Sequence, residues 1–156
     1  MAVEGLPATL LLEIVTPDRS LVTDKVDEVV APAAEGYLGV LPGHTPLLAT
    51  LAAGELWYRQ GGRRSYLAII GGFLEVLPDK VTVLAQIAER AEDIDVARAR
   101  RAKERAEEKL AKPAVEIDIP RAQASLLRAT VRLQVAALAA TGRSSSGTPA
   151  PTSMPA

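Results

Sequence analysis

The sequence predicts an α+β protein, in which an N-terminal antiparallel β-sandwich or flattened barrel is followed by a C-terminal antiparallel two-helix hairpin. Two observations carry this prediction. The first half contains many short β-prone segments separated by turns, and the second half contains long stretches of helix-forming Ala, Arg, Glu and Lys. We place the sandwich at residues 1–88, the hairpin at residues 89–141 and a disordered tail, rich in Ser and Pro, at residues 142–156.

The candidate strands are short, and turn residues such as Thr16–Arg19, Gln60–Gly62 and Pro78–Asp79 separate them. No ten-residue helical pattern interrupts them, so a parallel sheet built from βαβ units is not expected. Aromatic residues make up only 3% of the chain, so Val, Leu, Ile and Ala must fill the core. The expected strands span residues 9–15, 21–30, 36–41, 47–51, 54–59, 64–70, 72–77 and 80–85.

The pattern changes to helical periodicity near Glu89. Asp93 or Asp95 is a suitable N-cap for the first helix, and Pro113 is expected to end it. The second helix is expected to begin near Asp118, with a proline in its first turn. The apolar stripes at three- and four-residue spacing are Val96, Ala99, Ala102, Ala106 and Leu110 on the first helix, and Leu126, Thr130, Leu133 and Ala137 on the second.

Composition and motifs exclude several classes of function. A net charge of −1 and a pI near 5.9 argue against nucleic acid as the main partner. The chain has no cysteine, and His44 is its single histidine, so neither a metal site nor a catalytic residue is expected. The glycines do not follow a phosphate-loop pattern, and no segment has the continuous apolar length of a membrane span.

Three segments together resemble the epsilon subunit of bacterial F-type ATP synthases. They are GYLGVLPGHTPLLATLAAGEL at residues 36–56, LAIIGGFLEVLPDKVTVLAQIAERAEDID at residues 67–95, and LLRATVRLQVA in the second helix. The resemblance runs from about residue 10 to residue 136. It implies a non-catalytic subunit of the central stalk, located peripherally at the cytoplasmic face of the bacterial plasma membrane.

The resemblance also implies the partners. The sandwich would bind the gamma subunit and the c-ring, and the hairpin would either fold against the sandwich or extend along gamma into the catalytic alpha/beta head, where it restrains ATP hydrolysis. The contact residues implied for gamma and the c-ring are Glu35, Tyr37, Pro42, Gly43 and His44. Tyr37 stands where the family often has a polar or acidic residue. The alternative for His44 is a turn residue, hydrogen-bonded between Gly43 and Pro46.

The same resemblance implies that ATP, which is not a required cofactor, is a regulatory ligand of the hairpin. IDVARA at residues 94–99 matches the I-D-x-x-R-A pattern with which some bacterial epsilon subunits bind ATP. An antiparallel hairpin can bring four arginines together, and a triphosphate would offset their mutual repulsion. The residues of the implied site are Glu89, Ile94, Asp95, Arg98, Ala99, Arg105, Arg128 and Arg132.

Two alternatives stay open for the hairpin. Its mixed charges can form an ordinary solvated, salt-bridged face, and its arginines can belong to a free-standing nucleotide sensor. A second I-D-x-x-R-A match, IDIPRA at residues 117–122, is interpreted mainly as helix capping, because proline suits a first turn.

Overall fold

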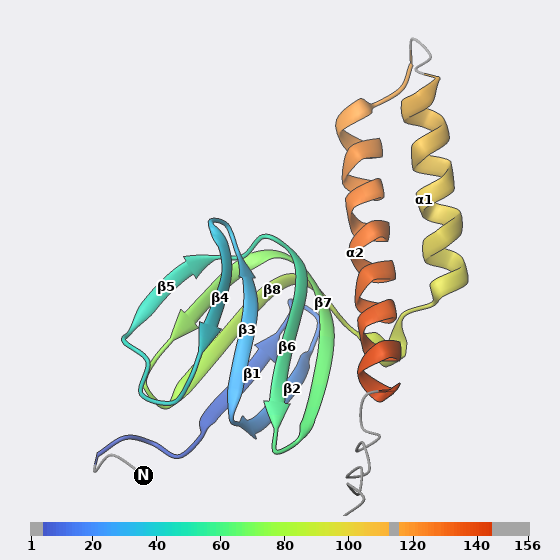
Figure 1. The fold of residues 1–156 in the computed structure, drawn as a ribbon. Helices are drawn as coiled ribbons and strands as arrows, with labels where there is room; N and C mark the ends of the chain where they lie inside the picture. Colours follow the sequence, from blue (N-terminus) through green and yellow to red (C-terminus); the bar gives the residue numbers. More distant parts are fainter. Residues whose placement is uncertain (1–4, 113–115, 145–156) are drawn as a thin grey trace, which may run out of the picture.

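The computed structural model describes residues 5–112 and 116–144, which form a β-sandwich with a two-helix hairpin beside it (Figure 1). The predicted fold class is confirmed. Among the described residues, no helix is both long enough and apolar enough to cross a membrane. The elements are β1 (Leu10–Val15), β2 (Ser20–Val26), β3 (Glu28–Ala33), β4 (Gly36–Val40), β5 (Leu47–Thr50), β6 (Ala53–Gln60), β7 (Arg63–Val76), β8 (Lys80–Arg90), a 3₁₀ turn (Ala91–Asp93), α1 (Val96–Ala111) and α2 (Ile119–Ser144).

The eight strands form one sheet in the order β2-β1-β8-β7-β6-β3-β4, and β5 pairs with the second half of β7. A bridge between Ala33 and Leu51, with a hydrogen bond from Ala34 N to Thr50 O of 2.9 Å, folds the sheet back on itself. The β1–β8 pair is parallel, which departs from the expected antiparallel arrangement. It can be parallel because β1 and β8 are the first and last strands of the domain in sequence, so that no tight turn has to join them.

Alternating aliphatic side chains fill the space between the layers. Leu10, Leu12 and Ile14 of β1 are fully buried, and the residues between them face outward. The largest fully buried side chains are all Leu, Ile or Val, as the low aromatic content requires. No charged or polar residue is buried among those that the structure describes.

The longest strand, β7, corrects the prediction of two strands separated by Gly71 and Gly72. The strand continues through these glycines, whose φ angles are +68° and +115°. A Cβ at Gly72 would lie 2.0 Å from Leu84 O, so only glycine fits there. The kink reverses the face of β7 that points to the core. Ile69 and Leu74 are both buried, although their odd spacing would place them on opposite faces of a regular strand.

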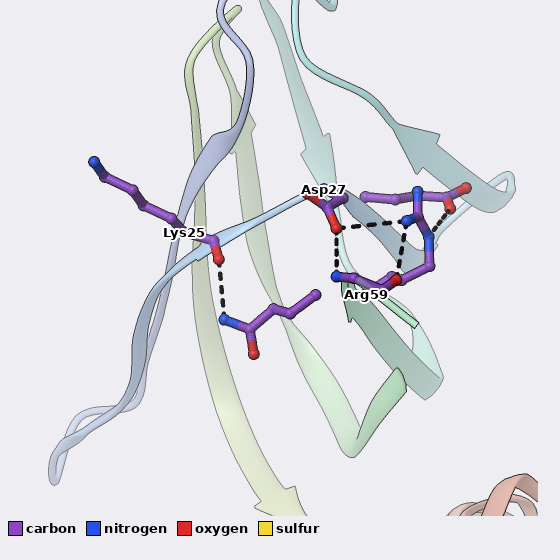
Figure 2. A network of polar contacts seen from close by, with 6 residues as sticks. Lys25, Asp27 and Arg59 are labelled. Atoms are coloured by element: carbon purple, nitrogen blue, oxygen red, sulfur yellow. Dashed lines mark hydrogen bonds and ion pairs between the residues drawn. The ribbon is translucent and has the colours of Figure 1, made fainter. Parts of the chain in front are cut away.

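The predicted strand at residues 21–30 is also corrected, because Asp27 separates β2 from β3. Asp27 Oδ2 accepts hydrogen bonds from Gly61 N (2.6 Å) and from Arg59 Nη1 (3.4 Å), as Figure 2 shows. Arg59 Nε also donates to Glu28 Oε2 at 3.4 Å, and Gln60 Nε2 donates to Lys25 O at 3.0 Å. This network ties the corner between the two strands to the β6–β7 hairpin, an interaction that local sequence does not reveal.

The helices begin at aspartate caps. Asp95 Oδ1 accepts a hydrogen bond from Arg98 N at 3.0 Å, and Asp118 Oδ1 accepts one from Arg121 N at 3.1 Å, so the expected starts are confirmed. The predicted Pro113 stop lies outside the described residues. Helix α2 runs to Ser144, past the expected end at residue 141, and residues 145–156 lie outside the described part of the chain.

Helix α2 has two buried faces, and the single predicted stripe was wrong. Ala122 and Ala129 are at most 5% exposed, whereas Ala137 of the predicted stripe is exposed. Val131 and Val135 form a cluster with Ala68 of β7. The helix therefore packs against α1 through small residues and against the sheet through valines. Figure 1 shows that only the C-terminal part of α2 lies beside the sandwich, while the rest of the hairpin projects away from it.

Candidate nucleotide-binding groove and contact surfaces

A groove of about 400 Å³ lies between the first turns of α1, the middle of α2 and the end of β8. Seven of the eight residues implied for ATP binding line it, and Ile94 does not. The lining residues are Glu89, Asp93, Asp95, Arg98, Ala99, Ala102, Arg105, Ser125, Arg128, Ala129 and Arg132.

Hydrogen bonds and an ion pair hold several groove side chains in place. Arg132 Nε lies 2.7 Å from Glu89 Oε2, which joins α2 to the last residues of β8. Arg128 Nη2 donates to Ser125 Oγ at 3.2 Å. The carboxylate of Asp95 is engaged by the backbone of its own helix, as described above. The guanidinium groups of Arg98 and Arg105, both exposed, form no ion pair among the described residues.

Ile94 lies beneath the groove. Its side chain is 8% exposed and packs in the apolar cluster that contains Val131 and Val135. In this structure it fixes the start of α1 against α2 and the sheet, so it positions Asp95 and Arg98. Ile94 therefore has little exposed surface for contact with a ligand in the groove.

The groove brings four arginines together with three carboxylates. Guanidinium groups present paired N–H donors that match phosphate oxygens, so the arrangement can bind an oligophosphate. Its volume falls within the range of about 300–1,000 Å³ that is typical of small-molecule sites. No cluster of three or more potential metal ligands occurs in the described residues.

Sequence reasoning missed four of the lining residues. Asp93 and Ala102 lie on α1 or just before it, and Ser125 and Ala129 lie on α2. Ser125 stands three residues before Arg128, a spacing that places both on one helix face and could have identified it. The two alanines make close approach of the helices possible, and this role depends on the packing.

The residues implied for contact with gamma and the c-ring lie at two places. Glu35 and Tyr37 are at the start of β4, whereas Pro42–His44 follow its end, a separation of roughly 13 Å along a strand of this length. His44 N donates to Leu41 O at 3.1 Å, and His44 Nδ1 contacts Thr45 O at 2.7 Å, so Nδ1 carries the proton. Gly43 has a φ of +86° and donates to Pro78 O at 2.7 Å.

The Tyr37 hydroxyl donates a hydrogen bond of 2.5 Å to Glu55 Oε2. Partial burial of the phenol is the main reason that the pKa of Tyr37 rises to about 12, and the hydrogen bond and the negative charge of Glu55 add to it. The residue as a whole is 56% exposed, so its ring remains available to a partner.

An exposed apolar patch lies on the outer face of the sandwich, and the sequence analysis missed it. It consists of Leu48, Phe73 and Leu84, which are 75%, 63% and 53% exposed, and we call it the outer patch. Phe73 and Leu84 are directly paired between β7 and β8, and Leu48 lies diagonally across from Phe73 on β5. Phe73 is the only phenylalanine of the chain, and its alternation with buried Leu74 is the signal that could have found it.

The fold defines a class of protein, namely a β-sandwich followed by a two-helix hairpin. Comparison with known families identifies the family within this class. Residues 9–91 match the β-sandwich domain of the ATP synthase delta/epsilon chain, and residues 92–137 match the long α-helix domain of the same chain. The protein therefore belongs to the ATP synthase delta/epsilon chain family.

Individual relatives agree with this assignment. The chain is 52% identical over 131 residues to the ATP synthase epsilon chain of Solibacter usitatus, covering 84% of this chain and 98% of that one. It is 53% identical over 127 residues to that of Nitratidesulfovibrio vulgaris, covering 81% and 95%. A chain in the Euglena gracilis mitochondrial ATP synthase structure (OSCP/F1/c-ring, rotational state 1) is similar in fold, with a TM-score of 0.66 and 26% identity over 88% of this chain and 84% of that one.

Proposed function

We propose that this chain is the epsilon subunit of an F-type ATP synthase, a component of the central stalk that binds gamma and the c-ring through its sandwich. The match to both domains of the family model supports this role most strongly. The chain would then lie at the cytoplasmic face of the plasma membrane, attached through the complex. The proposal assigns it no catalytic step.

The outer patch supports a protein partner for the sandwich. Contiguous exposed apolar side chains often mark a protein interaction site, whereas single exposed ones are common on any surface. We assign the outer patch to gamma and the Pro42–His44 loop to the c-ring. These assignments give the sandwich separate surfaces for its two partners.

The binding of gamma can be tested with Phe73→Asp. Phe73 is 63% exposed, so the variant should fold, and its affinity for a gamma-containing complex should fall by on the order of thirtyfold or more if Phe73 anchors the contact. The matched control is Leu127→Asp, which places the same charge at a half-exposed leucine of α2. Failure of the wild-type chain to join such a complex would overturn the proposed role.

We also propose that the hairpin restrains ATP hydrolysis when it leaves the sandwich, and that ATP in the groove stabilises the folded hairpin. The folded arrangement places Arg98, Arg128 and Arg132 around one groove, as an oligophosphate site requires. A ligand that binds only the folded form shifts the population toward it. In a reconstituted complex, ATP hydrolysis should therefore be faster with a chain that ends at Ala91 than with the full-length chain.

Calorimetry with ATP tests the groove directly. Arg98→Ala should weaken binding by about tenfold or more, because a charge-assisted hydrogen bond typically contributes about 1.5–3 kcal/mol. Arg100→Ala removes the same charge from an exposed position of α1 that does not line the groove, so it serves as the control. Equal losses in both variants, or no heat with the wild-type chain, would remove ATP from the proposal and leave the stalk role standing.

A further inference from the structure

The hairpin contains an internal repeat that relates its two helices. Ile94, Asp95, Arg98 and Ala99 at the start of α1 recur as a set with identical spacing at the start of α2. The same offset aligns further residues along both helices. The equivalent pairs are Ile94 and Ile117, Asp95 and Asp118, Arg98 and Arg121, Ala99 and Ala122, Arg105 and Arg128, Ala106 and Ala129, and Leu110 and Leu133.

The structure turns this repeat into an approximate two-fold symmetry. The helices are antiparallel, and their contact uses equivalent alanines, each at most 5% exposed: Ala99, Ala106, Ala122 and Ala129. The two N-terminal caps are equivalent as well, with Asp-to-backbone hydrogen bonds of 3.0 and 3.1 Å. Any groove that the repeat forms at one end of the hairpin is therefore expected to recur at the other.

A second groove, of about 550 Å³, lies where this symmetry requires it. Nine of its ten lining residues are the equivalents of residues that line the first groove, and Ile117 is the additional one. The lining residues are Ala102, Arg105, Ala106, Lys109, Glu116, Ile117, Asp118, Arg121, Ala122 and Ser125. Arg121 thus takes the place of Arg98, Arg105 that of Arg128, and Lys109 that of Arg132.

The two grooves differ at the wall that the sandwich provides. In the first groove, Glu89 of β8 pairs with Arg132, but no sandwich residue lines the second groove. Lys109, the equivalent of Arg132, forms no ion pair with a carboxylate in the part of the chain that the structure describes. The same holds for Arg105 and Arg121. Three cationic side chains from both helices therefore face two carboxylates, one of which, Asp118, already caps its helix.

We propose that the second groove is a separate binding site for a di- or triphosphate group, held by Arg105, Lys109 and Arg121. The site extends the anion chemistry proposed for the first groove, but its existence can be tested independently of ATP binding there. Paired guanidinium donors suit phosphate oxygens, and a lysine adds a further positive charge. Arg105 lines both grooves, so full occupancy of one site weakens the other.

The test is a titration of the full-length chain with tripolyphosphate, followed by calorimetry and by amide chemical shifts. The variants are Arg98→Ala, Arg121→Ala and the double substitution, with Arg100→Ala as a control for loss of charge. Arg98, Arg100 and Arg121 are all exposed, so the single variants should retain the fold. Binding that disturbs the amides of Arg121, Ala122 and Ser125 is expected in the wild-type chain and in Arg98→Ala.

Arg121→Ala should weaken this binding by about tenfold or more and leave the response of the first groove intact. The double variant should lose both responses. Unchanged amides around Arg121 in Arg98→Ala, or an equal loss in Arg100→Ala, would overturn the second site. Repeating the titration of Arg98→Ala with ATP shows whether the second groove binds a free phosphate chain or one carried by a nucleoside. If only the Arg98-dependent response is absent from the wild-type chain, the first groove is rejected as a binding site and the second is not.

Discussion

Leucine, isoleucine and valine side chains fill the interior of the sandwich, whereas the contact between the two helices is made largely of alanine. Leu10, Leu12 and Ile14 are fully buried in the sandwich, and their counterparts in the hairpin are residues such as Ala99 and Ala129. A buried leucine contributes about 1.5–3 kcal/mol relative to exposure, and an alanine contributes much less. The sandwich should therefore be stable by itself, and the hairpin should depend on additional interactions.

Those additional interactions are few, and they lie at the end of the hairpin that meets the sandwich: one small apolar cluster and one ion pair. The cluster around Val131 and Val135 docks α2, and the Glu89–Arg132 ion pair fixes the groove. Regions with few buried apolar contacts open at lower free energy than a domain core does. This difference in stability is what the proposed movement of the hairpin away from the sandwich would require.

The largest effect is expected from Gly72→Ala in the sandwich. The added methyl group would meet Leu84 O at 2.0 Å, at a backbone φ of +115° that L-residues rarely adopt. The free energy of unfolding should fall by on the order of 3 kcal/mol or more. Urea denaturation measures it, and Gly62→Ala, with open space around its Cβ, should change it by less than about 0.5 kcal/mol. Similar stability of the two variants would contradict the rigid kink in β7.

The next effect concerns the hairpin alone. Ala129→Leu inserts a large side chain where the residue is 1% exposed, so it should separate α1 from α2 at a cost of about 1–3 kcal/mol. Trypsin should then cleave the arginine-rich helices faster, while the thermal transition of the sandwich stays in place. Ala137→Leu, at an exposed position of α2, is the matched control. Unfolding of the sandwich together with the hairpin in Ala129→Leu would show that the two parts are one cooperative unit.

The sequence predicted the features that depend on local chemistry. The turn residues, the alternation of apolar side chains and the aspartate caps at Asp95 and Asp118 reflect interactions within a few residues, so the fold class and both helix starts could be predicted. The break between β2 and β3 at Asp27 and the continuation of β7 through Gly71 and Gly72 could not be predicted. The first depends on Arg59 and Gly61 from a distant hairpin, and the second depends on how β8 lies beside β7.

The residues of the groove likewise include some that local sequence predicted and others that depend on distant contacts. The antiparallel hairpin was expected to bring four arginines together, and Arg98 and Arg132 do line one groove. The position of Ile94 beneath the groove depends on the docking of α2 on the sheet, which helical periodicity alone does not define. The outer patch was missed because an exposed phenylalanine in a strand resembles a core residue until the sheet face is known.

A smaller effect is expected at the joint between the two parts. In a double-mutant cycle of Glu89→Gln and Arg132→Gln, the coupling free energy should be about 0.5–1 kcal/mol, because both side chains remain about a quarter to a third exposed. Hydrogen exchange in α2 reports the docking of the hairpin. The cycle of Lys103→Gln and Glu107→Gln, a more exposed pair within α1, should give less coupling. Coupling at Glu89 and Arg132 no greater than in this control would mean that apolar contacts alone dock the hairpin.

The smallest effect at neutral pH comes from Tyr37, whose pKa is about 12 in the folded chain and near 10 when unfolded. The folded state keeps the phenolic proton longer than the unfolded state does, so this stabilisation is complete below pH 10. It is lost as the pH rises from 10 through 12. At pH 7 the phenol is neutral in both states, so the wild-type chain and Tyr37→Phe should differ in stability only by the exposed hydrogen bond to Glu55. Above pH 10 the wild-type chain should lose stability relative to Tyr37→Phe. Glu55→Gln removes the charge that Tyr37 faces, so this pH dependence should become smaller. An unchanged pH dependence in Tyr37→Phe would assign the alkaline loss of stability to other groups and leave the Tyr37–Glu55 hydrogen bond as a surface contact of the sandwich.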